Sequence, residues 1–160
     1  MSEGGDPACW AHLVDSDAPR TATDEQLVRF VRTAAEAIVV CNRDGTIVFW
    51  NLAAETMFGW SPAEAVGRSL DLIIPERFRD RHWKGWHGAI ARGTTAYADR
   101  LLQVPATTRT GATISIASSM TLLFDGTGSV EGIAAIIRDE TEARARRLEL
   151  EARLRAQTDG

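Results

Sequence analysis

Cysteine is scarce in this chain of 160 residues, which contains only Cys9 and Cys41. Two cysteines do not form the disulfide framework that stabilises small secreted domains. No Cys-x-x-Cys-His segment occurs, so covalently attached c-type haem is not expected. Cys9 and His12 form an isolated Cys-x-x-His pair, which by itself predicts no zinc site.

An excess of positive charge and long apolar runs are also lacking. The chain has 18 lysines and arginines against 22 aspartates and glutamates, which gives a net charge of −4. Without a basic field we expect no nucleic-acid partner. The apolar runs are far shorter than the about 20 residues of a membrane-spanning helix, and the N-terminus lacks the basic start and apolar segment of a secretory signal. The sequence therefore predicts a cytoplasmic protein with no membrane partner.

Catalytic motifs are absent as well. The sequence has no Gly-x-Ser-x-Gly, phosphate-binding loop, His-Glu-x-x-His, kinase or cyclase signature. The carboxylates of its predicted helices are scattered in the way that is typical of solvated surfaces: Glu25, Glu36, Glu55 and Glu64. We therefore expect that the protein is not an enzyme.

The chain is long enough to bury the core of one domain with tails, and 44% of its residues are hydrophobic. Residues 1–23 are rich in small and polar residues, which predicts a flexible N-terminal tail. Residues 24–140 form the predicted domain. Residues 141–160 follow as a charged C-terminal helix, whose thin stripe of Leu150 and Leu154 is too short for a coiled coil.

The predicted domain begins with a helix and a hairpin. Asp44-Gly45 between two apolar runs predicts a β-hairpin over residues 37–50. Ser61 and Pro62 are typical of a helix start. Apolar spacing predicts helices over residues 24–36, 52–58, 62–66 and 75–93. Alternating patterns then predict three strands, over residues 95–104, 112–124 and 132–138, which completes an α+β order.

Three segments carry a family resemblance. The run WNLAAETMFGWSPAEAVGRSLDLIIP, from Trp50 to Pro75, follows the hairpin CNRDGTIVFWN, and IIRDET occupies residues 136–141. Together they resemble a PAS sensor domain over residues 25–146. The resemblance implies the PAS fold: a five-stranded antiparallel sheet with helices on one face, plus flanking helices at both ends. It also implies a sensory role, with the C-terminal helix passing the signal to a separate effector protein.

His82 is the leading candidate for a metal ligand. It shares one face of the predicted helix with apolar side chains: Phe78, Trp86, Ala89 and Ile90. A neutral imidazole there could ligate haem iron, and the alternative from spacing alone is a core histidine bonded to a backbone carbonyl. The stretch PERFRDRHWKGWHGAIARG resembles the corresponding helix of haem PAS domains in oxygen-sensing kinases and phosphodiesterases. The resemblance implies haem b on His82, with Phe78 and Trp86 beside it.

The opposite wall of the haem pocket is expected on the later strands. Alternation places Arg100 and Leu102 on one face of residues 95–104, while Met120 lies on the next strand. Arg100 could donate to bound oxygen, pair with a haem propionate, or lie on the surface. Leu102 and Met120 could wall the pocket or belong to plain core, and Met120 could be a sixth iron ligand.

The chain departs from both groups of oxygen sensors at this wall. The kinases carry an arginine where Leu102 lies, and the phosphodiesterases carry a methionine where Arg100 lies. A local basic cluster on the helix of His82 could meet haem propionates or simply cover the helix: Arg77, Arg79, Arg81 and Lys84.

Two other PAS cofactors are not expected. Flavin photosensors carry an Asn-Cys-Arg-Phe-type motif, whereas NLAAETMFGW here contains no cysteine. Coumarate photosensors need a reactive pocket cysteine, and a thiol on an apolar strand, such as Cys41, is usually inert.

The sequence leaves two hypotheses open. In the first, haem at His82 senses a diatomic gas (oxygen, CO or NO) or a redox state, and the junction of Arg138, Asp139 and Thr141 relays the change to the C-terminal helix. In the second, the PAS module binds an apolar small molecule or serves as a dimerisation domain without haem. We expect a homodimer under both hypotheses.

Overall fold

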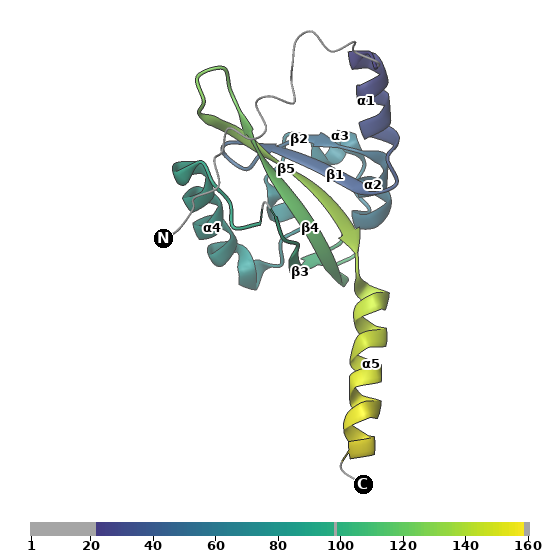
Figure 1. Cartoon of the computed structure of the whole chain (residues 1–160). Helices are drawn as coiled ribbons and strands as arrows, with labels where there is room; N and C mark the ends of the chain where they lie inside the picture. The colour runs from purple at the N-terminus through teal and green to yellow at the C-terminus, as the bar shows by residue number, and fades with distance from the viewer. Residues whose placement is uncertain (1–21, 98, 159–160) are drawn as a thin grey trace.

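The computed structural model describes residues 22–97 and 99–158, which form one sheet with helices around it (Figure 1). Five antiparallel strands pair in the order β2-β1-β5-β4-β3. Their bounds are β1 Ala37–Asn42, β2 Ile47–Trp50, β3 Leu102–Thr107, β4 Thr113–Phe124 and β5 Val130–Asp139. The predicted five-stranded α+β fold is confirmed, whereas most of the predicted flexible tail, residues 1–21, lies outside the described residues.

β1 and β2 form the predicted hairpin around Asp44-Gly45. Gly45 has a φ of +80°, in the left-handed region that glycine adopts at low cost. The side-chain oxygen of Asn42 accepts hydrogen bonds from the backbone N–H groups of Asp44 and Thr46, both at 3.0 Å. A side chain at position 45 would collide with the indole ring of Trp83. The turn therefore reverses the chain and also forms a flat docking point for Trp83.

The N-terminal helix α1 (Asp24–Thr33) ends three residues before the predicted end. Its start is as predicted, since Thr23 caps it in a reciprocal capping box. Its end is set by the buried side chain of Asn51, which donates to the carbonyls of Val31 and Glu36 at 3.2 and 3.0 Å. Because Asn51 is distant in sequence, helical spacing gives no sign of this termination.

Short helices and one longer helix connect β2 to β3. Their bounds are α2 Leu52–Phe58, α3 Pro62–Ala65, the 3₁₀ turns Leu70–Leu72 and Glu76–Phe78, and α4 Arg79–Arg92. The helices α2 and α3 match the prediction within one residue, and Ser61 caps α3 as expected. The predicted helix over residues 75–93 divides into a 3₁₀ turn and α4. Gly93 ends α4 in the left-handed conformation, with a φ of +66°.

The predicted strand over residues 95–104 is wrong before Leu102, because β3 spans Leu102–Thr107. The chain before it forms turns, and the Nε of Arg100 donates to the carbonyl of Ala96 at 2.8 Å. Local bonds from side chain to backbone compete with sheet pairing in this way. The alternating face that would join Arg100 to Leu102 therefore does not form.

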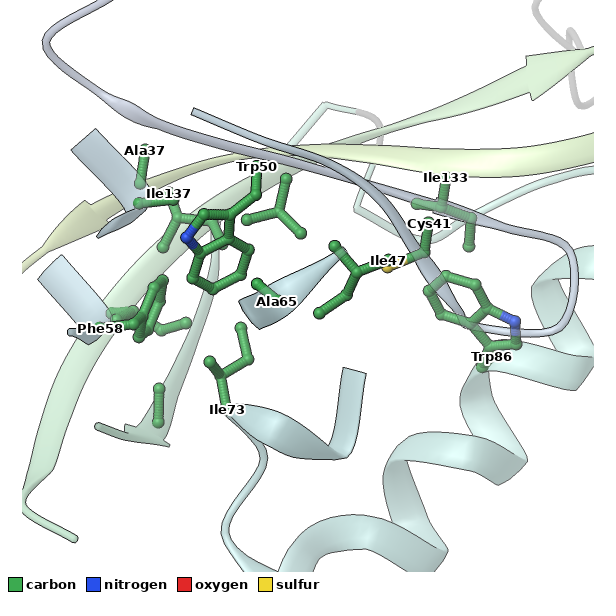
Figure 2. Packing of buried hydrophobic residues seen from close by; sticks show 14 residues of the cluster. Ala37, Cys41, Ile47, Trp50, Phe58, Ala65, Ile73, Trp86, Ile133 and Ile137 are labelled. Atoms are coloured by element: carbon green, nitrogen blue, oxygen red, sulfur yellow. The ribbon is translucent and has the colours of Figure 1, made fainter. Parts of the chain in front are cut away.

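The core lies between one face of the sheet and the helices α2, α3 and α4 (Figure 2). Alternate residues of β1 and β5 face these helices, and large aromatic side chains fill the space between them. The rings of Trp50 and Phe58 pack with centroids 5.4 Å apart, and Trp86 is buried at the other end. Burial of such side chains is the main source of stability, and here it also fixes α4 against the hairpin.

The helix α5 (Thr141–Thr158) leaves the end of β5 and extends away from the sheet (Figure 1). Its leucines Leu148, Leu150 and Leu154 are exposed. Ion pairs four residues apart, such as Glu142 with Arg146, support the isolated helix. The predicted charged C-terminal helix is confirmed, and its apolar stripe is open to solvent.

Candidate functional site

His82 lies on the side of α4 that faces the core. Trp86 and Ala89 on that side are buried, and His82 and Phe78 are half-buried, so the predicted amphipathic face is confirmed. The edge of the His82 ring meets Trp83 with centroids 4.9 Å apart, and Trp86 follows at 5.9 Å. An aromatic shell therefore restricts the orientation of the imidazole.

The Nε2 atom of His82 is buried and has no hydrogen-bond partner within the part of the chain that the structure describes. The predicted alternative was a histidine bonded to a backbone carbonyl, and Nε2 makes no such bond among the described residues. Burial lowers the pKa of His82, and the negative charge of Asp71 opposes that effect. His82 thus offers a neutral ring nitrogen, the form that binds haem iron, and it fits the role of an axial ligand.

Two tryptophans that follow His82 in the sequence fasten α4 to neighbouring segments. The Nε1 of Trp83 donates to Oδ1 of Asp71 at 2.8 Å, and its ring lies over Gly45. The Nε1 of Trp86 donates to the carbonyl of Arg43 at 3.0 Å. Sequence reasoning missed Trp83, for which the available signal was a second tryptophan next to the candidate ligand. Together the two indoles hold the backbone of His82 in one position relative to the hairpin.

The remaining predicted site residues divide into two groups. Leu102 and Met120 are half-buried, and strand pairing with Ser118 places Leu102 on the helix-facing side of the sheet. Arg100 is exposed, and its guanidinium stacks on Tyr97 at 5.1 Å. The structure therefore places Leu102 and Met120 on the same side of the sheet as α4 and leaves Arg100 on the surface. Contact of any of them with a ligand stays a prediction.

Cys41 is buried in β1, where burial raises the pKa of its thiol to about 12. A thiol with such a pKa is almost entirely protonated at neutral pH and is a poor nucleophile. The structure therefore supports the expectation that Cys41 is inert.

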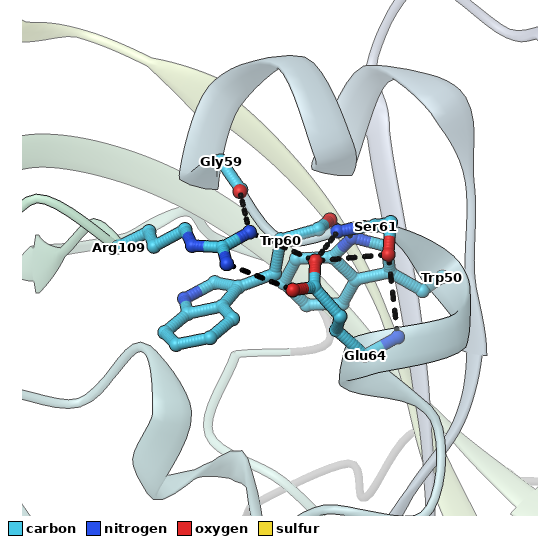
Figure 3. A network of polar contacts seen from close by, with 6 residues as sticks. All are labelled: Trp50, Gly59, Trp60, Ser61, Glu64 and Arg109. Atoms are coloured by element: carbon cyan, nitrogen blue, oxygen red, sulfur yellow. Dashed lines mark hydrogen bonds and ion pairs between the residues drawn. The ribbon is translucent and has the colours of Figure 1, made fainter.

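A polar network joins α3 to the turn between β3 and β4 (Figure 3). Both terminal nitrogens of Arg109 lie 2.9 Å from the carboxylate of Glu64, and the guanidinium stacks over Trp60 at 4.9 Å. Hydrogen bonds from the backbone N–H and hydroxyl of Ser61, followed by the charge of Arg109, lower the pKa of Glu64. The network joins segments that are distant in the sequence, so local sequence patterns do not predict it.

Two of the surface hollows among the described residues lie next to the flanking helix α5 and to α4. One, of about 300 Å³, lies where α5 meets the ends of β3 and β4. The other, of about 320 Å³, lies beside the start of α4. Three charged residues, Arg68, Asp71 and Arg79, line the second hollow. The other lining residues are Trp60, Ser69 and Leu72.

The start of α5 is bound to the sheet by several contacts. Oδ1 of Asp139 accepts from the N–H of Thr141 at 2.8 Å, and Oγ1 of Thr141 accepts from the N–H of Ser115 at 3.0 Å. Arg138 pairs with Glu36, between α1 and β1, at 2.8 Å. The junction thus connects α5 to β4 and to the end of α1.

Residues 22–97 and 99–158 hold no group of three or more histidine, cysteine, aspartate or glutamate side chains that could hold a metal ion. A purely protein-made metal centre is therefore not found in that part of the chain. A single histidine that supplies one axial bond to haem requires no such group.

A model of the PAS fold family matches residues 25–139, and the chain therefore belongs to the PAS family. A stretch of 120 residues is 30% identical to an uncharacterised protein of Azorhizobium caulinodans, and covers 74% of this chain and 16% of that protein. A stretch of 59 residues is 36% identical to the sensor protein FixL of Bradyrhizobium diazoefficiens, and covers 37% of this chain and 12% of FixL. The chain thus spans a small part of the curated relatives it matches.

A solved structure, that of an RNA-binding light-oxygen-voltage receptor, superposes with a TM-score of 0.69. The two are 22% identical, over 84% of this chain and 38% of that chain, so this likeness shows the fold alone. The family match and these likenesses agree with the PAS fold described above, and the sensor role is that of FixL.

Proposed function

We propose that this PAS module binds haem b through His82 and senses a diatomic gas (oxygen, CO or NO) or a redox state. The observation that supports the proposal most directly is the buried Nε2 atom of His82, which has no partner in the described residues. A polar atom left in this state costs stability, and such costs are typical of functional positions. When bound, haem supplies an iron that takes a diatomic ligand or changes its oxidation state.

Each part of the chain has a role in this proposal. His82 would hold the iron through Nε2, and the bonds of Trp83 and Trp86 would keep its ring oriented. Phe78 and Trp86 would supply apolar surface beside it, and the half-buried Leu102 and Met120 would form the opposite wall. Arg100 as a donor to the ligand stays a prediction, since its side chain lies on the surface.

The signal would leave through the junction at the start of α5. The contacts of Thr141 with β4 and of Arg138 with Glu36 couple the sheet to both flanking helices. A ligand that binds the domain more tightly when this junction has one arrangement than when it has another shifts the population towards the first arrangement. We propose that α5 carries this shift to a separate effector protein.

A second candidate function is a dimerisation or apolar-ligand module without haem. The helix α1 supports it, because its apolar side chains are open to solvent: Leu27 and Val28 are 51% exposed, and Phe30 is 69% exposed. Exposed apolar side chains of this kind are typical of an interface. We propose that α1 contributes to a homodimer under either function.

We also propose that the module binds rather than catalyses, and that it acts in the cytoplasm. Among the described helices, none combines the length and the apolar character that crossing a membrane requires. The catalytic motifs sought in the sequence are missing, which supports a binding role.

The first test is an absorption spectrum of the protein purified from cells supplied with a haem precursor. We expect a Soret band that His82→Ala abolishes or shifts. The matched control is His87→Ala, because His87 lies on the exposed side of the same helix. A colourless, folded wild-type protein after addition of haem would contradict the proposal and favour the module without haem.

A further inference from the structure

Ser118 is a buried polar residue in the middle of β4. Asn51 and Ser118 are the two buried polar residues among those that the structure describes, and Ser118 is 5% exposed. Asn51 bonds to four backbone groups. The hydroxyl of Ser118, by contrast, donates only to the carbonyl of the next residue, Ser119, at 3.5 Å. That distance exceeds the about 2.5–3.0 Å of a good O–H···O bond, so the hydroxyl is available to a better acceptor.

The position of Ser118 in the sheet directs its side chain towards the helices. Ile116 belongs to the core and Met120 packs against it, and both share a strand face with Ser118 because alternate residues of a strand point the same way. Across the ladder Ser118 pairs with Leu102 of β3 and Ile137 of β5. The hydroxyl is therefore surrounded by apolar neighbours, two of which are the predicted wall residues Leu102 and Met120.

A hydroxyl in such surroundings lowers the stability of the fold. It has given up its bonds to water, and a single long contact replaces them. An apolar side chain at this position of the strand would avoid that cost. A polar group that is kept at a cost in stability is typical of a position that binds a ligand.

We infer that the hydroxyl of Ser118 donates a hydrogen bond to the gas held by the haem, and that it selects oxygen over CO. The inference rests on the proposed haem function, in which Leu102 and Met120 form the wall opposite His82. Oxygen is a better hydrogen-bond acceptor than CO when each is held by haem iron, so a donor in this wall favours oxygen. The hydroxyl hydrogen rotates freely, so it can leave the carbonyl of Ser119 without any movement of the backbone.

The inference also replaces a predicted donor. Sequence reasoning considered Arg100 as the donor to oxygen, and its side chain lies on the surface, bonded to the carbonyl of Ala96. Ser118 alternates with apolar residues in the sequence of β4, but alternation alone did not show which face of the strand is buried.

The test measures the affinities for oxygen and for CO of three proteins loaded with haem b: the wild type, Ser118→Ala and Ser119→Ala. Ser119 is the matched control, because it is the next residue of the same strand and points to the opposite face. We expect Ser118→Ala to weaken oxygen binding by about fivefold to tenfold and CO binding by less than about twofold. Faster dissociation of oxygen should account for the loss, and Ser119→Ala should change neither affinity.

A second measurement needs no haem. The empty Ser118→Ala protein should unfold at the same urea concentration as the empty wild type or at a higher one, because the variant removes a hydroxyl that makes only a long contact. A lower midpoint would show that the hydroxyl is bonded within the fold, which would overturn the inference.

The outcomes separate the role of Ser118 from the proposed function. If Ser118→Ala changes the affinities for oxygen and CO in parallel, or changes neither, the inference is overturned, while a Soret band that depends on His82 still supports the haem function. If the wild type gives no Soret band that depends on His82, the proposed function fails and the inference fails with it.

Discussion

At the scale of single residues, the buried Nε2 of His82 lowers the stability of the empty domain and is available to bind a ligand. A polar atom that leaves water without finding a partner costs about 1–3 kcal/mol. The surrounding indoles of Trp83 and Trp86 offer π-faces and edges but no acceptor bonded to this atom within the described chain. The cost is recovered only when something bonds to Nε2, so the same atom weakens the empty domain and strengthens the occupied one.

His82→Leu should therefore stabilise the protein without haem. We expect its free energy of unfolding in urea to rise by about 1 kcal/mol, because the variant removes a buried polar atom without a partner and keeps the apolar volume. Haem binding should be lost in the same variant. His87→Leu, on the exposed side of α4, serves as the control and should change neither quantity. A destabilised His82→Leu protein would show that Nε2 is satisfied in solution.

The pKa of His82 predicts how stability depends on pH. Burial holds this pKa below the ordinary value of about 6.5, so the unfolded chain takes up a proton at a pH at which the folded protein does not. Acidification through about pH 6.5 then favours the unfolded state, until the pH falls below the pKa of the folded protein. Urea titrations between pH 8 and pH 5 should show this loss in the wild type and a smaller loss in His82→Leu. Identical pH profiles would contradict the prediction.

At the scale of elements, some features followed from local sequence and others did not. Asp44-Gly45 and Ser61 act within a few residues of their own positions, so the hairpin and the start of α3 were predictable. The end of α1 depends on Asn51 across the hairpin, and the pair of Arg109 with Glu64 joins residues 45 apart in sequence. His82 was found from one helix face, whereas the hollow beside the start of α4 was not predicted, because its lining comes from several segments.

Asn51 connects three elements through one side chain. Its oxygen accepts from the N–H groups of Ile38 and Ala54, and its nitrogen donates to the carbonyls of Val31 and Glu36. Asn51→Ala should lower the free energy of unfolding by about 3 kcal/mol, since it leaves one buried and three half-buried backbone groups without this partner. Urea denaturation measures this loss. The neighbouring exposed Leu52 gives the control, because Leu52→Ala should cost no more than about 0.5 kcal/mol.

The contact between Gly45 and Trp83 fixes α4 on the hairpin. Gly45→Ala should destabilise the protein by about 2–3 kcal/mol, because Ala is strained at a φ of +80° and its Cβ would collide with the indole. Gly126→Ala is the matched control, since no atom lies within 4 Å of a Cβ there. Thermal unfolding compares the two. Equal melting temperatures would show that Trp83 does not rest on the turn.

At the scale of the whole molecule, both flanking helices carry exposed apolar side chains. The core between sheet and helices is closed, whereas Leu27 and Phe30 of α1 and Leu150 and Leu154 of α5 are exposed. A second copy that covered these side chains would place the outputs of two domains side by side. Signal transfer would then depend on the relation between protomers and not on the fold of either one.

Phe30→Glu should shift the proposed homodimer towards monomer, because it puts a charge into the apolar side of α1. Sedimentation velocity at several protein concentrations measures the change, which we expect to be at least about tenfold in the dissociation constant. Arg32→Glu on the same helix tests whether added negative charge alone has this effect. A wild-type protein that is monomeric at all concentrations would rule out the homodimer.

The aromatic shell of His82 has an optical consequence. Trp83 and Trp86 are in contact distance of the imidazole, and both indole N–H groups are engaged by the protein itself. Their fluorescence therefore depends on what binds at the imidazole. A light-absorbing ring would quench the fluorescence by energy transfer, and a colourless apolar molecule would shift its emission maximum to shorter wavelength. The intrinsic fluorescence of the two tryptophans therefore reports whether a ligand is bound at His82.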